Sequence, residues 1–233
     1  MKPIRILLAE DHTIVRKGIR AMLQLDPCLI VLGEAKDGRQ AINLAVTHQP
    51  DVILMDIAMP KLNGLEATRQ LLKILPRTKV IILSAYDDDN YVSKAIDSGA
   101  VGYMLKQSSL DDLCRAIRSV MQGKIFFSHK IAVRLQQLNM EKNTTMKTLI
   151  THAAPLTARE SELLQLIAEG NANKQIASVL SISVKTVEKH RTSLMKKLNI
   201  HDIASLTRYA ISEGVVESCS QQSHTHLGSR DTK

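Results

Sequence analysis

The 233-residue chain lacks a long uninterrupted run of apolar residues and contains only three cysteines. A helix that spans a bilayer needs about 20 consecutive, mostly apolar residues, and no run approaches that length. The first residues, MKPIRILLAED, reach an acidic pair too early for the apolar core of a signal peptide. Cys28, Cys114 and Cys219 form no C-x-x-C pair and have no metal-type spacing to histidine, so we expect packed or surface thiols. We therefore expect a cytoplasmic protein without a membrane partner.

Acidic residues are outnumbered by basic ones, and the formal net charge is +8. A basic excess favours a polyanionic partner, but its location matters more than its size. Half of this excess lies within residues 123–149, and a basic connecting segment is usually just solvated. Bulk charge alone is therefore a weak argument for DNA binding. Apolar residues make up 44% and charged residues 23% of the chain, which argues against a mostly disordered or fibrous protein.

The first half of the chain alternates short apolar runs with amphipathic stretches. Five runs, IRILLA, LIVLGEA, DVILMD, KVIILSA and GYML, are each followed by a helical pattern. Continuous apolar runs separated in this way are typical of parallel strands that are buried on both faces and joined by right-handed crossovers. Residues 1–122 are therefore predicted to form an α/β domain with an open, doubly wound parallel sheet.

The second half of the chain has no strand pattern. Residues 123–154 have the composition of a linker, with a helical stretch at about 128–138. Four helical patterns follow, at about 157–169, 173–180, 184–198 and 203–213, and they predict an all-α domain over residues 155–216. Residues 217–233 are polar without periodicity and are predicted to be disordered.

Charged and polar side chains stand at the ends of four of the predicted strands. In chain order they are Glu10 and Asp11, Asp56, Ser84 and Lys106. Ligands of open parallel sheets bind at the carboxyl ends of the strands, so these residues are expected at one edge. Three carboxylates in one place repel one another unless a cation neutralises them, and an oxygen-rich site with room for water suits Mg²⁺. The sequence therefore predicts a magnesium site, with Asp11 and Asp56 as its first ligands.

A carboxylate in such a site can act as a nucleophile toward a phosphoryl group. The product would be an aspartyl phosphate at Asp56, with Lys106 and Mg²⁺ stabilising the charge on the transferring oxygens and Ser84 donating a hydrogen bond to them. Each residue alone has an ordinary alternative, because an aspartate at a strand end is usually a cap and a lone lysine is usually solvated. Together they favour a phosphoacceptor site.

Residues 1–122 resemble the receiver domain of two-component signalling, with ILLAED, ILMDIAMPKLNG, ILSA and GYMLK at the places expected for that family. The resemblance implies a five-stranded sheet in the order 2-1-3-4-5. It also implies that a sensor histidine kinase or a phosphotransfer protein phosphorylates Asp56. The Mg²⁺ ligands implied by the family are Glu10, Asp11, Asp56 and the backbone carbonyl of Ile57.

The same resemblance assigns roles to three further residues. Lys106 would pair with the phosphate, while Ser84 and Tyr103 would form a switch pair. In that family the hydroxyl residue moves toward the phosphate and the aromatic ring turns inward, which reshapes the surface around the fourth helix and the fifth strand. The alternative for Tyr103 is an aromatic residue that is half-buried on its strand.

Two departures from the receiver pattern are informative. Gln107 stands where the family often has proline with a cis bond, so either the bond after Lys106 is trans or that loop stores strain. Ala58 and Tyr86 flank the path of a hydrolytic water molecule, and neither is an acid or an amide that would orient the water. We therefore expect a long-lived phosphoryl form.

Residues 173–198 predict a short helix, a three-residue turn and a longer helix. On the longer helix Val184, Val187, Leu194 and Leu198 form an apolar stripe that is predicted to be buried. An adjacent stripe carries lysine, glutamate and threonine, whose side chains reach base edges and phosphates from a helix in the major groove. An ordinary solvated helix face explains this polar stripe equally well.

Residues 156–198 resemble the four-helix output domain of the LuxR type, because its L-T-x-R-E opening, N-K-x-I-A helix and K-T-V-x-x-H recognition helix occur in order. The whole chain is thereby similar to response regulators of the NarL/FixJ type, which bind promoter DNA as dimers at inverted half-sites. The resemblance implies base contacts by Glu188, Lys189 and Thr192. Phosphate contacts, which position a protein without reading sequence, are expected from Lys174, Lys185, Thr186, His190 and Lys196.

Two other functions fit parts of the sequence. Phosphatases of the haloacid dehalogenase type also use a strand-end aspartate with Mg²⁺, but they need a second aspartate two residues on, where this chain has Ala58. A signalling adaptor that binds a protein is disfavoured by the intact helix-turn-helix spacing. We therefore predict a non-enzymatic transcription regulator that forms a phosphorylation-dependent homodimer, with RNA polymerase as a further partner. Without phosphate, the receiver is expected either to mask the recognition helix or to leave the protein monomeric.

Overall fold

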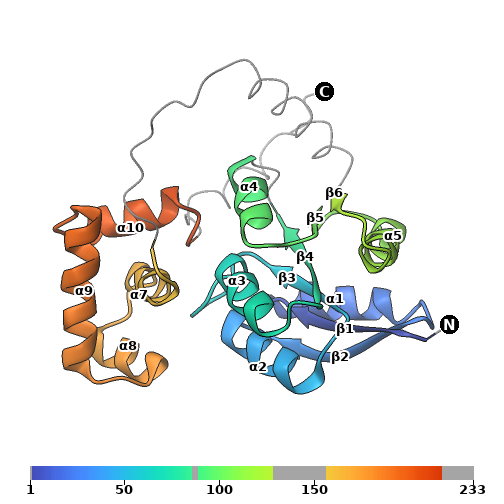
Figure 1. The fold of residues 1–233 in the computed structure, drawn as a ribbon, viewed down its shortest axis with the longest axis horizontal. Coiled ribbons are helices and arrows are strands. Elements are labelled where there is room, and N and C mark those ends of the chain that lie inside the picture. The colour runs from blue at the N-terminus through green and yellow to red at the C-terminus, as the bar shows by residue number, and fades with distance from the viewer. Residues whose placement is uncertain (1, 86–88, 128–155, 217–233) are drawn as a thin grey trace, which may run out of the picture.

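The structure is a computed structural model, and it describes residues 2–85, 89–127 and 156–216. In these ranges a parallel sheet with helices on both sides is followed by a group of four helices (Figure 1). Within the same ranges no helix is both long enough and apolar enough to cross a membrane. The helical stretch predicted at 128–138 and the tail predicted at 217–233 lie outside the described residues.

The sheet has the predicted parallel architecture. Its strand order is β2-β1-β3-β4-β5-β6, so the predicted order is confirmed and one strand is added beside β5. The first five strands match the five apolar runs: β1 (Ile4–Ala9), β2 (Leu29–Ala35), β3 (Val52–Asp56), β4 (Lys79–Ser84) and β5 (Gly102–Leu105). The added strand, β6 (Phe126–Phe127), lies in the segment predicted to be a linker. Two residues are too few to show the alternation by which a strand is recognised in a sequence.

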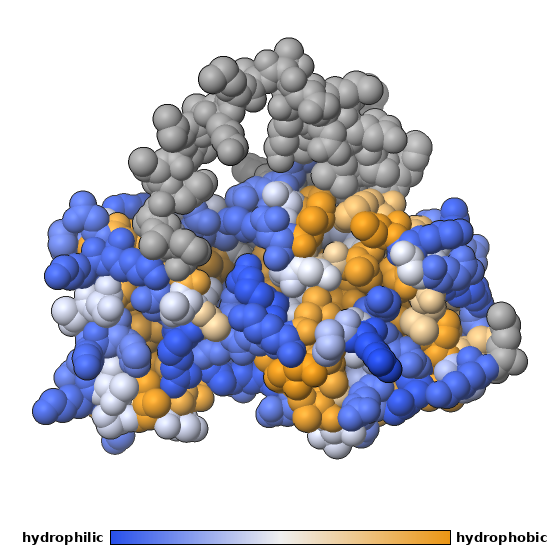
Figure 2. Space-filling model, in the orientation of Figure 1, coloured by the Kyte–Doolittle hydropathy of each residue, from blue (hydrophilic) through white to orange (hydrophobic). Residues whose placement is uncertain are grey.

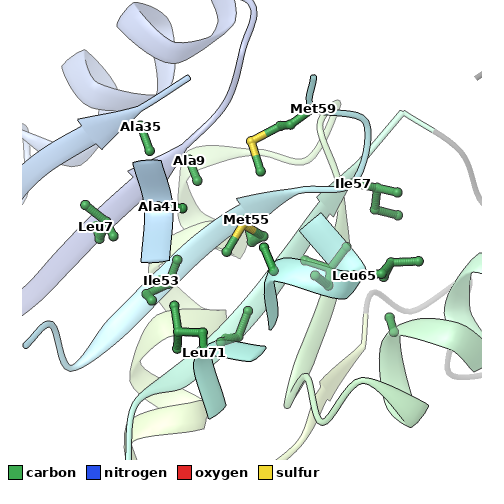
Figure 3. Close-up of a cluster of buried hydrophobic side chains, with 14 of the residues drawn as sticks. Leu7, Ala9, Ala35, Ala41, Ile53, Met55, Ile57, Met59, Leu65 and Leu71 are labelled. Atoms are coloured by element: carbon green, nitrogen blue, oxygen red, sulfur yellow. The ribbon is translucent and has the colours of Figure 1, made fainter. Parts of the chain in front are cut away.

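Helices cover both faces of the sheet. One face carries α2 (Gly38–His48), α3 (Gly64–Ile74) and α4 (Asp89–Asp97), and the other carries α1 (Thr13–Leu23) and α5 (Leu110–Met121). Successive strand residues alternate between the faces, so Leu7 and Ile53 pack toward α2 and α3, whereas Ile6 and Leu54 pack toward α1 and α5. Figure 3 shows the first of these clusters. Burial on both faces explains why the strands appear in the sequence as continuous apolar runs.

The turn after β3 fixes where α3 begins. Asn63 caps this helix, because its Oδ1 accepts a hydrogen bond from the Glu66 backbone N–H at 2.9 Å. The Gly64 N–H donates to the Ile57 carbonyl oxygen at 2.8 Å, which folds the start of α3 back onto the end of β3. A Cβ on Gly64 would lie 1.8 Å from the Asp56 carbonyl oxygen. Only glycine therefore permits this close approach.

The second part of the structure is all-α, as predicted. It consists of α7 (Ala158–Ala168), α8 (Asn173–Leu180), α9 (Val184–Leu198) and α10 (Ile203–Ser212). Val187 and Leu194 of α9 are fully buried in its core, and Leu198 packs against that core. The prediction that Val184 is buried is wrong, since 39% of this residue is exposed. Val184 is the first residue of α9, where the helix leaves the core.

Gly64→Ala is expected to lower the free energy of unfolding by about 1–3 kcal/mol or more, because a forced overlap in a packed interior is relieved only by moving the backbone. The matched control is Gly18→Ala in α1, where an added Cβ meets nothing within 4 Å. Alanine favours a helix over glycine by about 1 kcal/mol, so the control should be neutral or slightly stabilising. Urea unfolding followed by circular dichroism measures both variants, and equal stability of the two would contradict the close contact at Gly64.

Candidate functional site

The predicted acidic residues meet at one edge of the sheet. Glu10 and Asp11 follow β1 and Asp56 ends β3, which pairs directly with β1. One oxygen of each carboxylate and one nitrogen of His12 all lie within 4.8 Å of one another. The side chains of Glu10 and Asp56 are 0% and 3% exposed, so two of the three carboxylates are buried. His12 joins the cluster because it directly follows the acidic pair.

Lys106 supplies the positive charge at this cluster. Its Nζ lies 2.8 Å from Glu10 Oε2 and 2.9 Å from Asp56 Oδ2. Burial raises the pKa of Asp56 to about 7, against the opposing charge of Lys106 and with a further rise from the charge of Glu10. Burial alone would lower the pKa of Lys106, but the charge of Asp56 and the close contacts with both carboxylates raise it above its ordinary value. Lys106 therefore remains an ammonium ion.

Three buried oxygens in the cluster retain unused bonding capacity. Glu10 Oε2, Asp11 Oδ1 and Asp56 Oδ2 accept no hydrogen bond of normal geometry in the described part of the chain, although Lys106 and His12 lie within ion-pair distance. Such oxygens cost free energy unless a cation or a donor satisfies them. Three carboxylates and one ammonium leave an excess of negative charge that a divalent ion would neutralise. The donor set fits Mg²⁺, which prefers oxygen ligands.

The backbone carbonyl of Ile57, predicted as a further ligand, is already engaged. Its oxygen accepts hydrogen bonds from the Gly64 N–H at 2.8 Å and from the Met59 N–H at 3.2 Å. A carbonyl oxygen has two lone pairs, so little capacity is left for a metal ion. Within the described ranges, no backbone N–H donates to the carbonyl oxygen of the next residue, Ala58. The geometry therefore disfavours Ile57 as a ligand.

The predicted switch pair lies on neighbouring strands. Ser84 ends β4 and is 1% exposed, while Tyr103 in β5 is 0% exposed and packs within the hydrophobic cluster of the α2 and α3 face. Tyr103 is thus fully buried, in place of the half-buried alternative. The peptide bond between Lys106 and Gln107 is trans, which decides between the two possibilities left by the missing proline. Tyr86 lies outside the described residues.

A buried arginine beneath the acidic cluster was not predicted. Arg16 of α1 is 5% exposed and donates to the backbone carbonyls of Glu10 and Asp11, at 2.7 and 3.1 Å. Its Nε also pairs with Glu34 Oε2 at 3.1 Å. Arginine at a helix surface is usually solvated, so composition does not reveal this role. The signal in the sequence is its place in the first turns of the helix that begins directly after the acidic pair.

Helices α8 and α9 form the predicted helix-turn-helix. The turn between them contains Ser181 in the left-handed region, with φ of 52°. Ser183 then caps α9 by accepting a hydrogen bond from the Thr186 N–H at 3.1 Å. Arg191 of α9 donates to Asn173 Oδ1 at 2.6 Å, which holds the start of α8 against the middle of α9. The recognition helix is thus fixed at its start and along its length.

The L-T-x-R-E motif has a structural role. Thr157 caps α7 and Glu160 completes the capping box, since each side chain bonds the backbone of the other. Glu160 also pairs with Lys197 near the end of α9 at 2.7 Å. Arg159 donates to the Leu180 carbonyl at the end of α8, at 2.8 Å. This motif therefore joins α7 to both helices of the helix-turn-helix.

The predicted DNA-contact residues lie on α8 and α9, and most of them are exposed. Exposed are Lys174, Lys185, Glu188, Lys189, Thr192 and Lys196, and partly buried are Thr186 and His190. Both hydroxyl groups of this set have internal partners, because Thr186 Oγ1 lies 2.8 Å from Ser183 Oγ and Thr192 Oγ1 donates to the Glu188 carbonyl at 3.0 Å. Figure 1 shows α9 on the far side of α7 from the sheet. The exposed face of α9 is therefore accessible to a duplex.

The helical part contacts the turn that follows Asp56. Gln165 of α7 is 2% exposed; its Oε1 accepts a hydrogen bond from the Asn63 N–H at 2.7 Å, and its Nε2 donates to the Met59 carbonyl at 2.8 Å. Beside it, Glu169 Oε1 accepts a hydrogen bond from the Lys61 N–H at 3.0 Å. Side chains of α7 and of its C-terminal cap residue, Glu169, thus hold the backbone of residues 59–63. No periodic pattern marks Gln165, because its partners are backbone groups far away in the chain.

Further polar contacts surround this junction. Glu162 of α7 pairs with Arg39 at 2.7 Å and accepts a hydrogen bond from Gln70 at 3.0 Å. Lys94 of α4 pairs with Glu213, just after α10, at 2.9 Å. Figure 2 shows hydrophilic residues along the seam between the two parts. Hydrogen bonds and ion pairs therefore join the two parts.

Two family models match the chain. The model described as "Response regulator receiver domain" matches residues 6–118, which include the acidic cluster and Lys106. The model described as "Bacterial regulatory proteins, luxR family" matches residues 154–210, which include the helix-turn-helix. Each match coincides with one of the two parts of the structure.

Similar proteins share this arrangement along most of their length. The transcriptional regulatory protein LiaR of Bacillus subtilis (strain 168) is 40% identical over 207 residues, 89% of this chain and 96% of LiaR. The structure of the Salmonella typhimurium response regulator RcsB matches 91% of this chain and 100% of that chain, with 27% identity and a TM-score of 0.55. A structure of an RcsB–DNA complex matches 90% of this chain and 98% of that chain, with the same identity and TM-score. The chain belongs to the two-component response regulators that join a receiver domain to a LuxR-type helix-turn-helix domain.

Proposed function

We propose that phosphorylation of Asp56 controls the binding of this regulator to promoter DNA. The observation that carries the proposal is the place of the buried Asp56 carboxylate, between the Lys106 ammonium and the carboxylates of Glu10 and Asp11. A buried carboxylate with an adjacent cation and unused oxygen capacity is suited to accept a phosphoryl group.

Phosphoryl transfer requires Asp56 in its ionised form. One carboxylate oxygen attacks the phosphorus of a donor phosphohistidine, the new P–O bond forms as the P–N bond breaks, and the imidazole leaves with the electron pair of that bond. Lys106 stabilises the charge on the phosphoryl oxygens, and the Ser84 hydroxyl donates a hydrogen bond to one of them. Tyr103, on the neighbouring strand β5, stays buried when the Ser84 side chain moves toward the phosphoryl group.

The carboxylates of Glu10, Asp11 and Asp56 would hold Mg²⁺. We assign the backbone ligand to the Ala58 carbonyl in preference to that of Ile57, because the Ile57 oxygen already accepts two hydrogen bonds. A bound Mg²⁺ supplies neutralisation of the negative charge on the transferring phosphoryl group. The phosphodonor is a sensor histidine kinase or a phosphotransfer protein, and we place this exchange in the cytoplasm.

The exposed face of α9 is the proposed DNA-binding surface. Base contacts fall to Glu188, Lys189 and Thr192, and phosphate contacts to Lys174, Lys185, Thr186, His190 and Lys196. The N-terminus of α9 adds the positive end of a helix dipole near Lys185, which favours a phosphate there. RcsB is known both in a complex with DNA and as dimers bound to DNA, and we propose a homodimer on two half-sites for this chain as well. RNA polymerase is a further proposed partner.

The receiver controls the output through the turn between Asp56 and α3. Because α9 lies away from the sheet, masking of the recognition helix does not explain inhibition in this arrangement. The contacts of Gln165 and Glu169 with residues 59–63 instead fix the position of α7. Phosphorylation would shift this turn, weaken these contacts and release the helical part to form a dimer that binds DNA.

Treatment of the full chain with acetyl phosphate and Mg²⁺ is expected to add one phosphoryl group and to raise the affinity for promoter DNA by about 5- to 150-fold, the usual range of coupling between two sites. Mass spectrometry and fluorescence anisotropy measure the two effects. After the acetyl phosphate is removed, the added mass should persist for minutes, because Ala58 cannot orient a water molecule.

Asp56→Asn removes the nucleophile and should abolish both effects. Asp111→Asn, an exposed aspartate of α5, is the matched control and should respond as the wild type does. The proposal fails if untreated Asp56→Asn binds DNA and dimerises as tightly as the treated wild type.

On α9, Lys185→Ala should weaken binding to all duplexes alike and reduce the slope of log K against log salt by about 1, since one phosphate contact is lost. Glu188→Ala should relax the preference at one base pair by about 1–3 kcal/mol. Lys17→Ala in α1 removes the same charge far from α9 and should change neither quantity. Anisotropy over a set of single-base operator variants separates these outcomes, and a lysine variant that alters preference at one base only would refute its assignment.

At the junction, Gln165→Ala leaves the Asn63 N–H and the Met59 carbonyl without their partner, which costs about 1–3 kcal/mol for each group that remains buried. The helical part should then separate from the receiver without phosphorylation, so the radius of gyration and the DNA affinity of the untreated protein should both rise. Gln24→Ala, an exposed glutamine that follows α1, is the control. Small-angle scattering and anisotropy decide the matter, and an unchanged radius with unchanged affinity would exclude this route.

A further inference from the structure

We propose that Arg16 is a positioning residue for the phosphoacceptor site. Its guanidinium holds the backbone of Glu10 and Asp11 so that both carboxylates converge beside Asp56. The inference rests on the proposed phosphorylation of Asp56 and deepens it, because it identifies what keeps mutually repelling carboxylates in place before a cation binds.

The contacts of Arg16 are directed at the backbone of the acidic pair. One nitrogen, Nη1, donates to the Glu10 carbonyl at 2.7 Å and to the Asp11 carbonyl at 3.1 Å. The other terminal nitrogen lies 3.4 Å from Thr13 Oγ1. Only 6% of the Arg16 side chain is exposed, so these bonds are shielded from water. A planar guanidinium with fixed donors constrains two successive carbonyls in a way that a lysine ammonium does not.

The side chain is itself held from the other end. Arg16 Nε donates to Glu34 Oε2 at 3.1 Å, and Arg20 pairs with the second oxygen of Glu34. Hydrogen bonds from Arg20 and then Arg16, opposed by partial burial, lower the pKa of Glu34, which therefore stays charged. Since β2, which carries Glu34, pairs with β1, the sheet itself anchors the guanidinium.

The charge pattern indicates that Arg16 contributes geometry and not neutralisation. Its ion-pair partner is Glu34, which also pairs with Arg20, while its contacts with Glu10 and Asp11 are to neutral carbonyl groups. The carboxylate cluster therefore keeps its excess of negative charge for a divalent cation. Two other bonds fix the same loop, from the Glu10 N–H to the Ala35 carbonyl at 3.0 Å and from the His12 N–H to Glu10 Oε1 at 3.1 Å. Arg16 in turn holds the carbonyl groups of Glu10 and Asp11.

The test measures cation binding to the unphosphorylated full chain. Mn²⁺, a substitute for Mg²⁺, is titrated and its free concentration is followed by electron paramagnetic resonance, with Mg²⁺ as competitor. Arg16→Met is expected to weaken binding by about 10- to 100-fold, the usual effect of losing a group that orients metal ligands. Arg16→Lys keeps one donor and should recover part of the loss. The acetyl phosphate reaction of Arg16→Met should need a correspondingly higher Mg²⁺ concentration for its half-maximal rate.

Arg20→Met is the matched control, because it removes the other partner of Glu34 without touching the carbonyls. An exposed ion pair contributes little, so its cation affinity should stay within about twofold of the wild type. A purely structural role for Arg16 predicts a different result: a lower melting temperature for Arg16→Met with an unchanged dissociation constant in the folded protein. That result overturns the inference.

Two further results separate this inference from the proposed function. If the wild type itself binds no Mn²⁺, the proposed metal site is wrong irrespective of Arg16. If Arg16→Met does not fold, Arg16→Lys and Glu34→Ala decide, since the latter removes the acceptor that anchors the guanidinium and leaves both carbonyls intact. Wild-type affinity in both of these variants overturns the inference, and weakening in both supports it.

Discussion

Three carboxylates meet at the ends of β1 and β3, and like charges at such short range raise the free energy of the folded protein unless something opposes their repulsion. Several features of the surrounding fold act against it. Lys106 brings an ammonium group from the end of β5, Arg16 and Glu34 secure the loop that carries two of the carboxylates, and Gly64 lets α3 start directly against the third. The parallel sheet, buried on both faces, is the rigid base on which this arrangement is possible.

This electrostatic repulsion also bears on the proposed phosphoryl transfer to Asp56. Burial raises the pKa of Asp56 to about 7 even with the ammonium of Lys106 beside it, so an added cation that favours the ionised carboxylate would bind favourably. The repulsion between the carboxylates raises the free energy of the protein without a ligand, and a cation that relieves this repulsion would bind more tightly for that reason. The sheet must therefore be stable enough to offset the repulsion between the carboxylates that it holds together.

Much of this could be predicted from the sequence, and the rest could not for physical reasons. The five long strands and four helices of the output domain follow from hydrophobic periodicity, and the site residues follow from their places at strand ends. Strand β6 was missed because two residues show no period. Arg16 and Gln165 were missed because their partners are backbone carbonyl and amide groups, which every residue has and which leave no trace in side-chain patterns. The Ile57 carbonyl was assigned by resemblance alone, and its competing hydrogen bonds appear only in three dimensions.

The junction between the two parts is polar, in contrast to the apolar cores that stabilise each part. Hydrogen bonds and ion pairs exchange readily with water, so such a junction can open at a small cost in free energy, whereas an apolar seam would hold more firmly. A reversible contact of this kind is what the proposed release of the helical part requires.

Residues 57–63 contact both the end of β3 and the helical part. On one side this short turn closes over the end of β3, where Asp56 lies, and on the other its amides and carbonyls are bound by α7. On the proposed mechanism, a substitution in the turn that alters the response of the output domain would therefore also disturb the acceptor site. Substitutions of Gln165 or Glu169 would change the strength of the proposed coupling with less effect on Asp56, because these two side chains contact the turn and not Asp56. We would accordingly look to α7, and not to the receiver, for the residues that set how strongly different members of this family hold their two halves together.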